Sequence, residues 1–430
     1  MAVHTPTAYP LRSVNKGELE QLCQVLWGWP QCQDPTHCFS DDHFHRLSLF
    51  FDFYKQVSSS YVPDFFDPDD QALRSHQDLF DIISLLRDFG GHSTREDCRK
   101  MYFWGRASED DIKKDDGTPC NIPLADQERA FNIAATVMTM VRTSSLNDLA
   151  TPSFDIITLD EEQGRTMLQD VTGPFVWRLE QTLLEAVVDT FPSRLHPSLQ
   201  PGDPQSKTIL HELTAINLTK IAKLKFMGTS DLRNHLRLDP VSGTVRIFHH
   251  TSFLKQHLLS SKRDIKKQEH NLAANLDSTS SSHFQQHDGF IFPRSIALET
   301  LQTLNVLFPP PSHPQFHQCQ SLLRGLVAKS TFDPDILRFG TTAYQLPSES
   351  MGKINSSGSF PTWGTRLMTL YSELEDPTPR SILDNWLERR SKSRHVMMVT
   401  LVGVTVAVLL GVLSLGVSIF QAWISWQEWK

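Results

Sequence analysis

The chain has 430 residues, with 41 Lys and Arg against 49 Asp and Glu, and six cysteines. This length accommodates two or three domains, and so few cysteines exclude a disulfide framework. The net charge of −8 conceals two opposed halves, because residues 1–219 hold 18 basic and 33 acidic residues whereas residues 220–430 hold 23 and 16. Residues 1–16 lack the apolar core of a secretory signal, so we expect most of the chain to stay in the cytosol.

The first half is predicted to form an acidic helical domain at 17–206, preceded by a flexible N-terminus at 1–16. Its apolar residues recur at intervals of three and four, which is the period of an amphipathic helix. The predicted helices cover residues 17–27, 42–56, 69–89, 126–142 and 176–191. Asp-rich and Pro-marked stretches at 64–70 and 110–118 predict loops between them.

Residues 207–268 predict a basic module that resembles a winged helix. Helical stretches at 213–224 and 230–235 precede two alternating runs, 236–239 and 244–249, joined by turn residues, and Thr251 or Ser252 begins a last helix. Residues 220–267 contain 11 basic and three acidic residues. This basic stretch either packs against the acidic half or faces a partner, which would be nucleic acid or anionic lipid.

The remaining residues divide into a linker at 269–290, a small helical region at 291–375 and a membrane-proximal part. Helices are predicted at 294–307, 315–327 and 362–374, and three prolines at 309–311 separate the first two. A basic juxtamembrane helix at 376–395 leads into a transmembrane helix at 396–424 and a short tail at 425–430. The predicted fold class is therefore mainly α, with a small winged-helix-like hairpin module and one C-terminal transmembrane helix.

The span itself is the most specific signal in the sequence. Val396 to Phe420 contains 25 residues without a charge, and at 1.5 Å per residue it reaches roughly 37 Å, enough for a hydrocarbon core of about 30 Å. Four cations precede it: Arg389, Arg390, Lys392 and Arg394. The positive-inside rule then keeps the N-terminal region cytosolic. The position of the span, which leaves the ribosome last, favours tail-anchored insertion. The same cations either serve topology alone or bind an anionic leaflet.

Small residues gather on one side of this helix. At 100° per residue, Gly403, Ala407, Gly411, Ser414 and Ser418 fall within one arc. Such a face lets a second helix approach closely, so we expect a homo-oligomer through the span.

Catalytic motifs are scarce: the chain has no Gly-x-x-x-x-Gly-Lys-Ser/Thr loop, no Gly-x-Ser-x-Gly elbow and no His-Glu-x-x-His helix. The pair His249 and His250 with Ser252 could place a base beside a hydroxyl at a strand-to-helix turn. The alternative is that the hydroxyl caps the helix and one imidazole is buried, and we favour this structural interpretation. The catalytic interpretation requires an acid to converge on the pair.

Metal ligands are suggested only by a short Cys/His segment, in which Cys32, Cys38, His43 and His45 are the candidates. The five residues between the cysteines exceed the spacing of two to four that holds a tight zinc turn. We therefore expect an ordinary loop here, no metal and no cofactor.

Three stretches together resemble a family of filamentous-fungal proteins with a C-terminal membrane span and no established function. They are residues 129–141, residues 231–239 with 249–257, and residues 367–430, and their most specific strings are His-His-Thr-Ser-Phe-Leu-Lys and Trp-Leu-Glu-Arg-Arg-Ser. The resemblance implies a membrane-anchored protein and brings no chemistry with it. Residues 213–259 also resemble the winged-helix segment of fungal signalling NTPases, but the chain lacks their phosphate loop, so that activity does not carry over.

These observations predict a non-enzymatic interaction or regulatory protein on the cytosolic side of a membrane. Its expected partners are the lipid bilayer, anionic lipid and a second copy of the chain. An enzyme using His249, His250 and Ser252 is the first alternative. A nucleic-acid-binding winged-helix module is the second, and it is disfavoured because a membrane anchor holds the chain away from chromatin.

Overall fold

The computed structural model describes residues 10–29, 41–64, 70–105, 122–143, 175–261, 291–329, 332–338, 359–378 and 394–429. The predicted loop at 110–118, all of the linker at 269–290 and residues 379–393 of the juxtamembrane helix lie outside these ranges.

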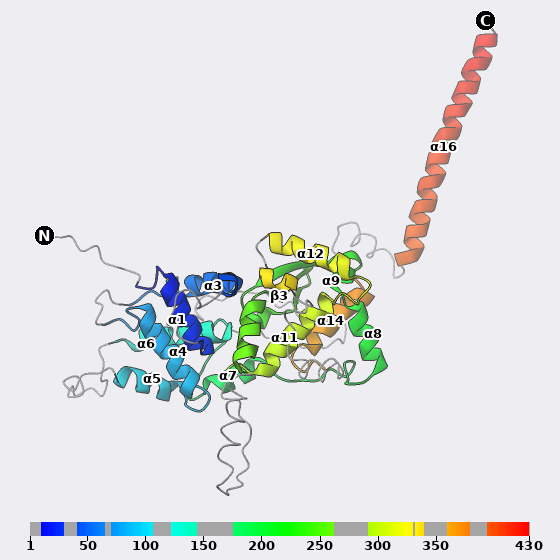
Figure 1. Ribbon diagram of the computed structural model, residues 1–430. Helices are drawn as coiled ribbons and strands as arrows, with labels where there is room; N and C mark the ends of the chain where they lie inside the picture. The colour runs from blue at the N-terminus through cyan, green and yellow to red at the C-terminus, as the bar shows by residue number, and fades with distance from the viewer. Residues whose placement is uncertain are drawn as a thin grey trace, which may run out of the picture.

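The fold of the described residues is mainly helical, as predicted, with one small sheet (Figure 1). The N-terminal helices are α1 (Lys16–Trp27), α2 (Asp41–Arg46), α3 (Ser48–Ser59), α4 (His76–Phe89), α5 (Arg95–Trp104) and α6 (Leu124–Thr139). The following elements are α7 (Leu183–Thr190), α8 (Pro204–Glu212), α9 (Ala215–Lys220), β1 (Lys225–Thr229), η4 (Leu232–Asn234), β2 (Arg237–Asp239), β3 (Thr244–Phe248) and a helix over residues 251–261. The last elements are α11 (Arg294–Leu307), α12 (Phe316–Ala328), η5 (Pro334–Arg338), α14 (Gly364–Glu375) and α16 (Arg394–Glu428).

Capping boxes define where several helices begin. Asn15, Ser75, Thr94 and Thr182 each accept from the backbone N–H three residues later, and the acidic side chain there accepts from the cap in return. Two orphan backbone donors are satisfied at each start. The box at Thr182 explains why the helix predicted at 176–191 begins only at Leu183.

Several predicted boundaries were wrong for local reasons. The helix predicted at 42–56 is divided at Leu47 into α2 and α3, and the one predicted at 213–224 is shortened to α9, which is separated by Leu213 and Thr214 from α8 before it. Thr214 accepts from the backbone N–H of Asn217 and so begins α9 anew. The stretch at 230–235 forms only the short 3-10 turn η4, and α5 was not predicted at all.

The sheet contains the predicted hairpin and one unexpected strand. β2 and β3 pair antiparallel, with Arg237 opposite Arg246, while β1 joins the other edge of β3 in parallel, with Met227 opposite Arg246. Val245 and Ile247 of β3 are fully buried. One face of the sheet therefore packs into the core, and the hairpin is followed by the helix that the sequence predicts.

One continuous core joins the N-terminal helices to the later elements. The ring of Phe253, in the helix over 251–261, lies 5.8 Å from that of Trp27 and 5.2 Å from that of Phe50. The hydroxyl of Ser260 donates to the backbone carbonyl of Trp27. Figure 1 accordingly places α1 to α6 on one side of the body and α8 to α14 on the other.

Helix α11 is buried along almost its whole length, and three of its polar side chains bind other elements. The Glu299 carboxylate accepts from the backbone N–H groups of Thr362 and Trp363, both at 2.7 Å, at the start of α14. Thr303 bonds the ring of His235 at 2.7 Å. A helix without a solvent face requires such partners, because an unpaired buried polar group is costly.

The ring of His235 is fixed in one tautomer by its two neighbours. Its Nδ1 accepts from the backbone N–H of Phe248, and the Thr303 hydroxyl already donates to the carbonyl of Thr300. The Nε2–H of His235 must therefore donate to Thr303, which describes a neutral imidazole. Burial, with a smaller contribution from Arg366, holds the pKa of His235 well below its ordinary value.

Replacing Glu299 by Gln should destabilise the protein by about 2 kcal/mol, because an amide presents one acceptor and two donors to a site built for a carboxylate. The expected result is a lower midpoint of thermal unfolding of the detergent-solubilised chain. Glu180→Gln makes the same change on an exposed side chain and serves as the control. Equal midpoints for the two variants would contradict the capping role of Glu299.

Candidate functional site

The catalytic candidates of the sequence lie in a buried polar group of residues at the start of the helix over 251–261. We call this group the capping cluster, and its members are His249, His250, Thr251, Ser252, Lys255, Asp333 and Asp335. The first five come from the end of β3 and the first turns of the helix, and the two acids come from the segment that enters η5. All of them except His249 are buried.

Asp333 caps this helix from a distant part of the chain. One of its carboxylate oxygens accepts from the backbone N–H of Ser252 at 3.0 Å and from its hydroxyl at 2.5 Å. The other oxygen accepts from the backbone N–H of Asp335 at 3.0 Å. A carboxylate at a helix N-terminus satisfies orphan donors and complements the helix dipole. The cap expected from Thr251 or Ser252 is therefore supplied by Asp333.

Lys255 and Asp335 form the second link of the capping cluster. The ammonium donates to Asp335 Oδ2, and both side chains are almost completely buried, at 7% and 1% exposure. Burial lowers the pKa of Lys255, while the charge of Asp335 acts in the opposite direction. Asp335 Oδ1 is buried without a hydrogen bond. This half-satisfied pair is strongly coupled, because each ion is the main compensation for the other.

The histidine pair is present but does not reach the hydroxyl in any hydrogen bond. The Nε2 atoms of His249 and His250 lie 3.0 Å apart, so one ring donates to the other and both cannot be protonated on these atoms. Burial, and next the neighbouring His249, hold the pKa of His250 well below its ordinary value. Its ring packs against those of Phe53 and Phe248, and its Nδ1 has no hydrogen bond.

This geometry suits structural support better than nucleophilic catalysis. The catalytic hypothesis required an acid to converge on the histidine pair, but Asp333 instead binds the hydroxyl of Ser252 together with the backbone N–H that it caps. Ser252 is 4% exposed and Asp333 is fully buried, so a substrate carbonyl would have to enter the core to meet the oxygen. Burial raises the pKa of Asp333 and its hydrogen bonds oppose that shift.

Sequence reasoning missed Asp333, Asp335 and Lys255. The two acids flank Pro334 in an Asp-Pro-Asp string, which is a turn signal and offers a carboxylate to a nearby backbone. Their partners are about 80 positions earlier in the chain, and no local period connects two such segments.

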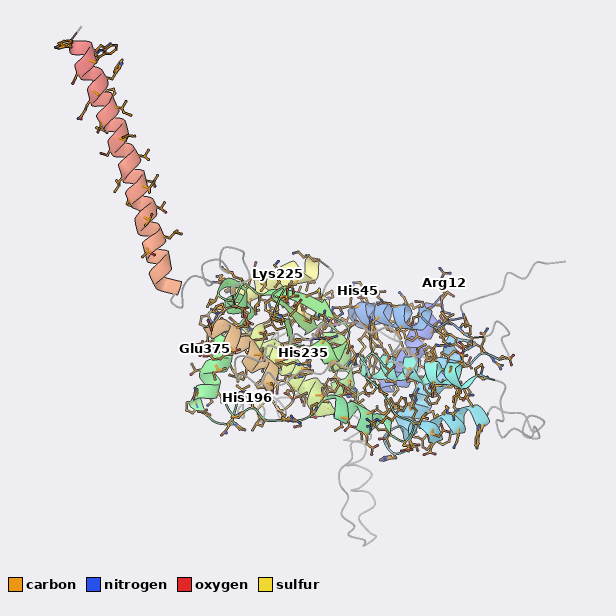
Figure 2. The ribbon with its side chains drawn as sticks, turned by 180° about the vertical axis from the view of Figure 1, so that it is seen from behind. Arg12, His45, His196, Lys225, His235 and Glu375 are labelled. Atoms are coloured by element: carbon orange, nitrogen blue, oxygen red, sulfur yellow. The ribbon has the colours of Figure 1, made fainter. Side chains whose placement is uncertain are left out.

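The metal candidates are only partly covered by the described residues. Cys32 and Cys38 lie outside them, His43 falls within α2, and His45 is exposed on the same helix (Figure 2). Within the residues that the structure describes, no group of three His, Cys, Asp or Glu side chains is arranged to hold a metal ion.

The predicted membrane helix is present as α16, from Arg394 to Glu428. Residues Thr400–Gln427 form a candidate span in which no residue is buried against the rest of the chain. The proposed packing face, Gly403, Ala407, Gly411, Ser414 and Ser418, is exposed throughout. Ser418 donates its hydroxyl to the carbonyl of Ser414. Of the predicted cationic flank, Arg389, Arg390 and Lys392 lie outside the described residues, and Arg394 begins the helix.

Comparison of the chain with models of protein families, with curated proteins and with solved structures gave no match. The function of the chain is therefore inferred from the residues described above.

Removing one partner of the buried ion pair should cost far more than removing both. Asp335→Asn leaves the Lys255 ammonium buried without its counter-ion, and we expect a loss of about 3 to 5 kcal/mol, whereas Asp335→Asn with Lys255→Met should recover most of it. A double-mutant cycle with Lys255→Met alone measures the coupling through chemical unfolding in detergent. Additive losses would show that the two side chains do not depend on each other.

Buried histidines should make the protein sensitive to acid. Burial lowers the pKa of His257 to about 4, against about 6.5 in an unfolded chain. Between these values the unfolded chain binds the proton and the folded chain does not, so the free energy of unfolding falls as the pH falls, by about 1.4 kcal/mol per pH unit for each such group.

His257→Gln should therefore flatten this dependence between pH 6.5 and 4 by about 1.4 kcal/mol per pH unit, because glutamine retains a donor for the carbonyl of Phe292 without titrating. The measurement is chemical unfolding as a function of pH. His45→Gln, on an exposed side chain, is the matched control and should leave the slope unchanged. An unchanged slope in His257→Gln would mean that this ring titrates normally.

Proposed function

We propose that the protein is held to a membrane by α16 and acts as a non-enzymatic interaction or regulatory protein on the cytosolic face. The observation that carries the proposal is the exposure of α16 from Thr400 to Gln427. The apolar residues from Leu401 to Phe420 all face outward, and 20 helical residues rise about 30 Å, the thickness of a hydrocarbon core. A helix of this composition is stable in lipid rather than in water.

Aromatic residues beyond the apolar band support a span that ends at an interface. Trp423, Trp426 and Trp429 follow the band and are 52%, 63% and 92% exposed. Tryptophan is enriched at the headgroup level of membranes, where one edge of its ring is wet. The basic residues before the span favour the orientation in which the folded body lies on the cytosolic side.

Self-association through α16 is part of the proposal. No described side chain lies within 4 Å of a Cβ built on Gly403 or Gly411, so this face can admit the backbone of a second helix. The hydroxyl of Ser418 is already bonded within its own helix. Close packing of backbones, rather than hydrogen bonds from Ser418, is therefore the expected contact between two copies.

The capping cluster supports a non-enzymatic function because its polar groups bind one another inside the body. Ser252 and Asp333 bond each other at a helix start, and Lys255 and Asp335 neutralise each other in the core. These bonds stabilise the position of η5 against the helix over 251–261. A body of this kind offers its surface, rather than its buried polar groups, to partners.

The test is membrane extraction of the full chain carrying an N-terminal fluorescent protein. Val406→Arg, Leu410→Arg and Leu413→Arg together should oppose insertion by about 9 kcal/mol, since an arginine at the centre of a span costs about 3 kcal/mol. The chain should move from the carbonate-resistant pellet to the soluble fraction, as should a chain without residues 381–430.

Three arginines at exposed apolar positions of the body, Val62, Val188 and Leu195, are the matched control and should leave the chain in the pellet. Retention of the α16 variant in the pellet would refute anchoring by this helix.

A further inference from the structure

The outer face of the sheet combines cations with an exposed apolar turn. The register places Arg237 of β2, Arg246 of β3 and Met227 of β1 opposite one another, so their side chains share one face, and Lys225 shares it two residues before Met227. Figure 2 shows Lys225 at the edge of the body. The opposite face carries Val245 into the core.

Arg237 and Arg246 lie directly opposite each other on adjacent strands, and Arg237 also donates to Asn234 Oδ1. The acid on this face among the described strands is Asp239, and it is used by the turn. Its carboxylate accepts from the hydroxyl and backbone N–H of Ser242 and from the backbone N–H of Val241. The hydrogen bond from the Ser242 hydroxyl is the main cause that lowers the pKa of Asp239. Three cations and one carboxylate leave this surface positive.

The turn between β2 and β3 holds an apolar side chain in solvent. Val241 is 88% exposed, and Asp239 fixes its backbone. Gly243 closes the turn with φ +65°, a conformation that favours glycine. The backbone N–H of Lys225 donates to the carbonyl of Gly243 at 2.8 Å, which brings this lysine beside the tip. Ile221, 52% exposed, lies four residues before Lys225.

The chain keeps this surface close to the membrane that α16 would cross. Helix α14 packs on β2, and the side chain of Arg366 donates to the backbone carbonyls of Arg233 and His235. Residues 379–393 connect the end of the body to α16, and a fully extended connection of this length reaches only about 55 Å. The effective concentration of the bilayer at the sheet is correspondingly high.

We propose that the β2–β3 turn and the outer face of the sheet dock on an anionic bilayer surface. Val241 enters the headgroup region, and Lys225, Arg237 and Arg246 face the lipid charges. This inference rests on the proposed function, because it takes α16 to be inserted in the same bilayer. The exposed apolar side chain of Val241 and the short connection select lipid over nucleic acid as the partner of this basic surface.

The test is hydrogen exchange of the full chain reconstituted in nanodiscs. One preparation contains phosphatidylcholine alone, and the other contains three parts phosphatidylcholine to one part phosphatidylserine. The amides of residues 241–246 should exchange on the order of tenfold more slowly in the anionic discs. Val241→Asp with Lys225→Glu should remove the difference, whereas Val188→Asp, at an exposed valine of α7, should retain it.

The outcomes separate this inference from the function on which it rests. If the amides of α16 are protected in both lipids while residues 241–246 exchange equally, the docking surface is refuted and the anchor stands. If the amides of α16 are unprotected, the anchor fails and the docking inference fails with it. Slower exchange of residues 241–246 on addition of duplex DNA, and not in anionic discs, would overturn lipid in favour of nucleic acid.

Discussion

The burial of α11 on nearly all sides is the constraint on which the arrangement of the later elements depends. A helix without a solvent face can keep polar side chains only if other segments bring partners to them. Glu299 receives the start of α14, Thr303 receives the ring of His235 beside the sheet, and the indole N–H of Trp363 donates to Thr300. Three residues of the same helix thus position two other parts of the chain, the start of α14 and the segment that carries His235.

Buried carboxylates solve the same problem elsewhere in the fold. Asp333 caps the helix over 251–261, and Asp126 accepts from the backbone N–H of Ala72 and the hydroxyl of Tyr61. In each case a carboxylate of one segment accepts a hydrogen bond from a backbone N–H of another segment, 54 or 81 residues away. These contacts explain why the strongest catalytic candidate of the sequence, Ser252 beside two histidines, is part of the scaffold.

Features with a local period were predictable, and features that depend on distant partners were not. The bounds of α11 agree with its apolar spacing, as do the hairpin and the long apolar helix α16. Helix α5 was missed although Thr94 and Asp97 form a capping box, because its sequence is strongly charged. Strand β1 was missed because its parallel partner, β3, lies beyond η4 and β2. For the candidate site, the sequence indicated Ser252 and the buried imidazole, whereas Asp333, Asp335 and Lys255 emerge only from the tertiary contacts.

The attachment of α14 determines how mechanical load would pass through the molecule. A pull that reached α14 would load two contacts: the first turn of the helix, which Glu299 holds, and the side chain of Arg366, which binds two backbone carbonyls beside the sheet. Such a force would be divided between α11 and the segment that precedes β2.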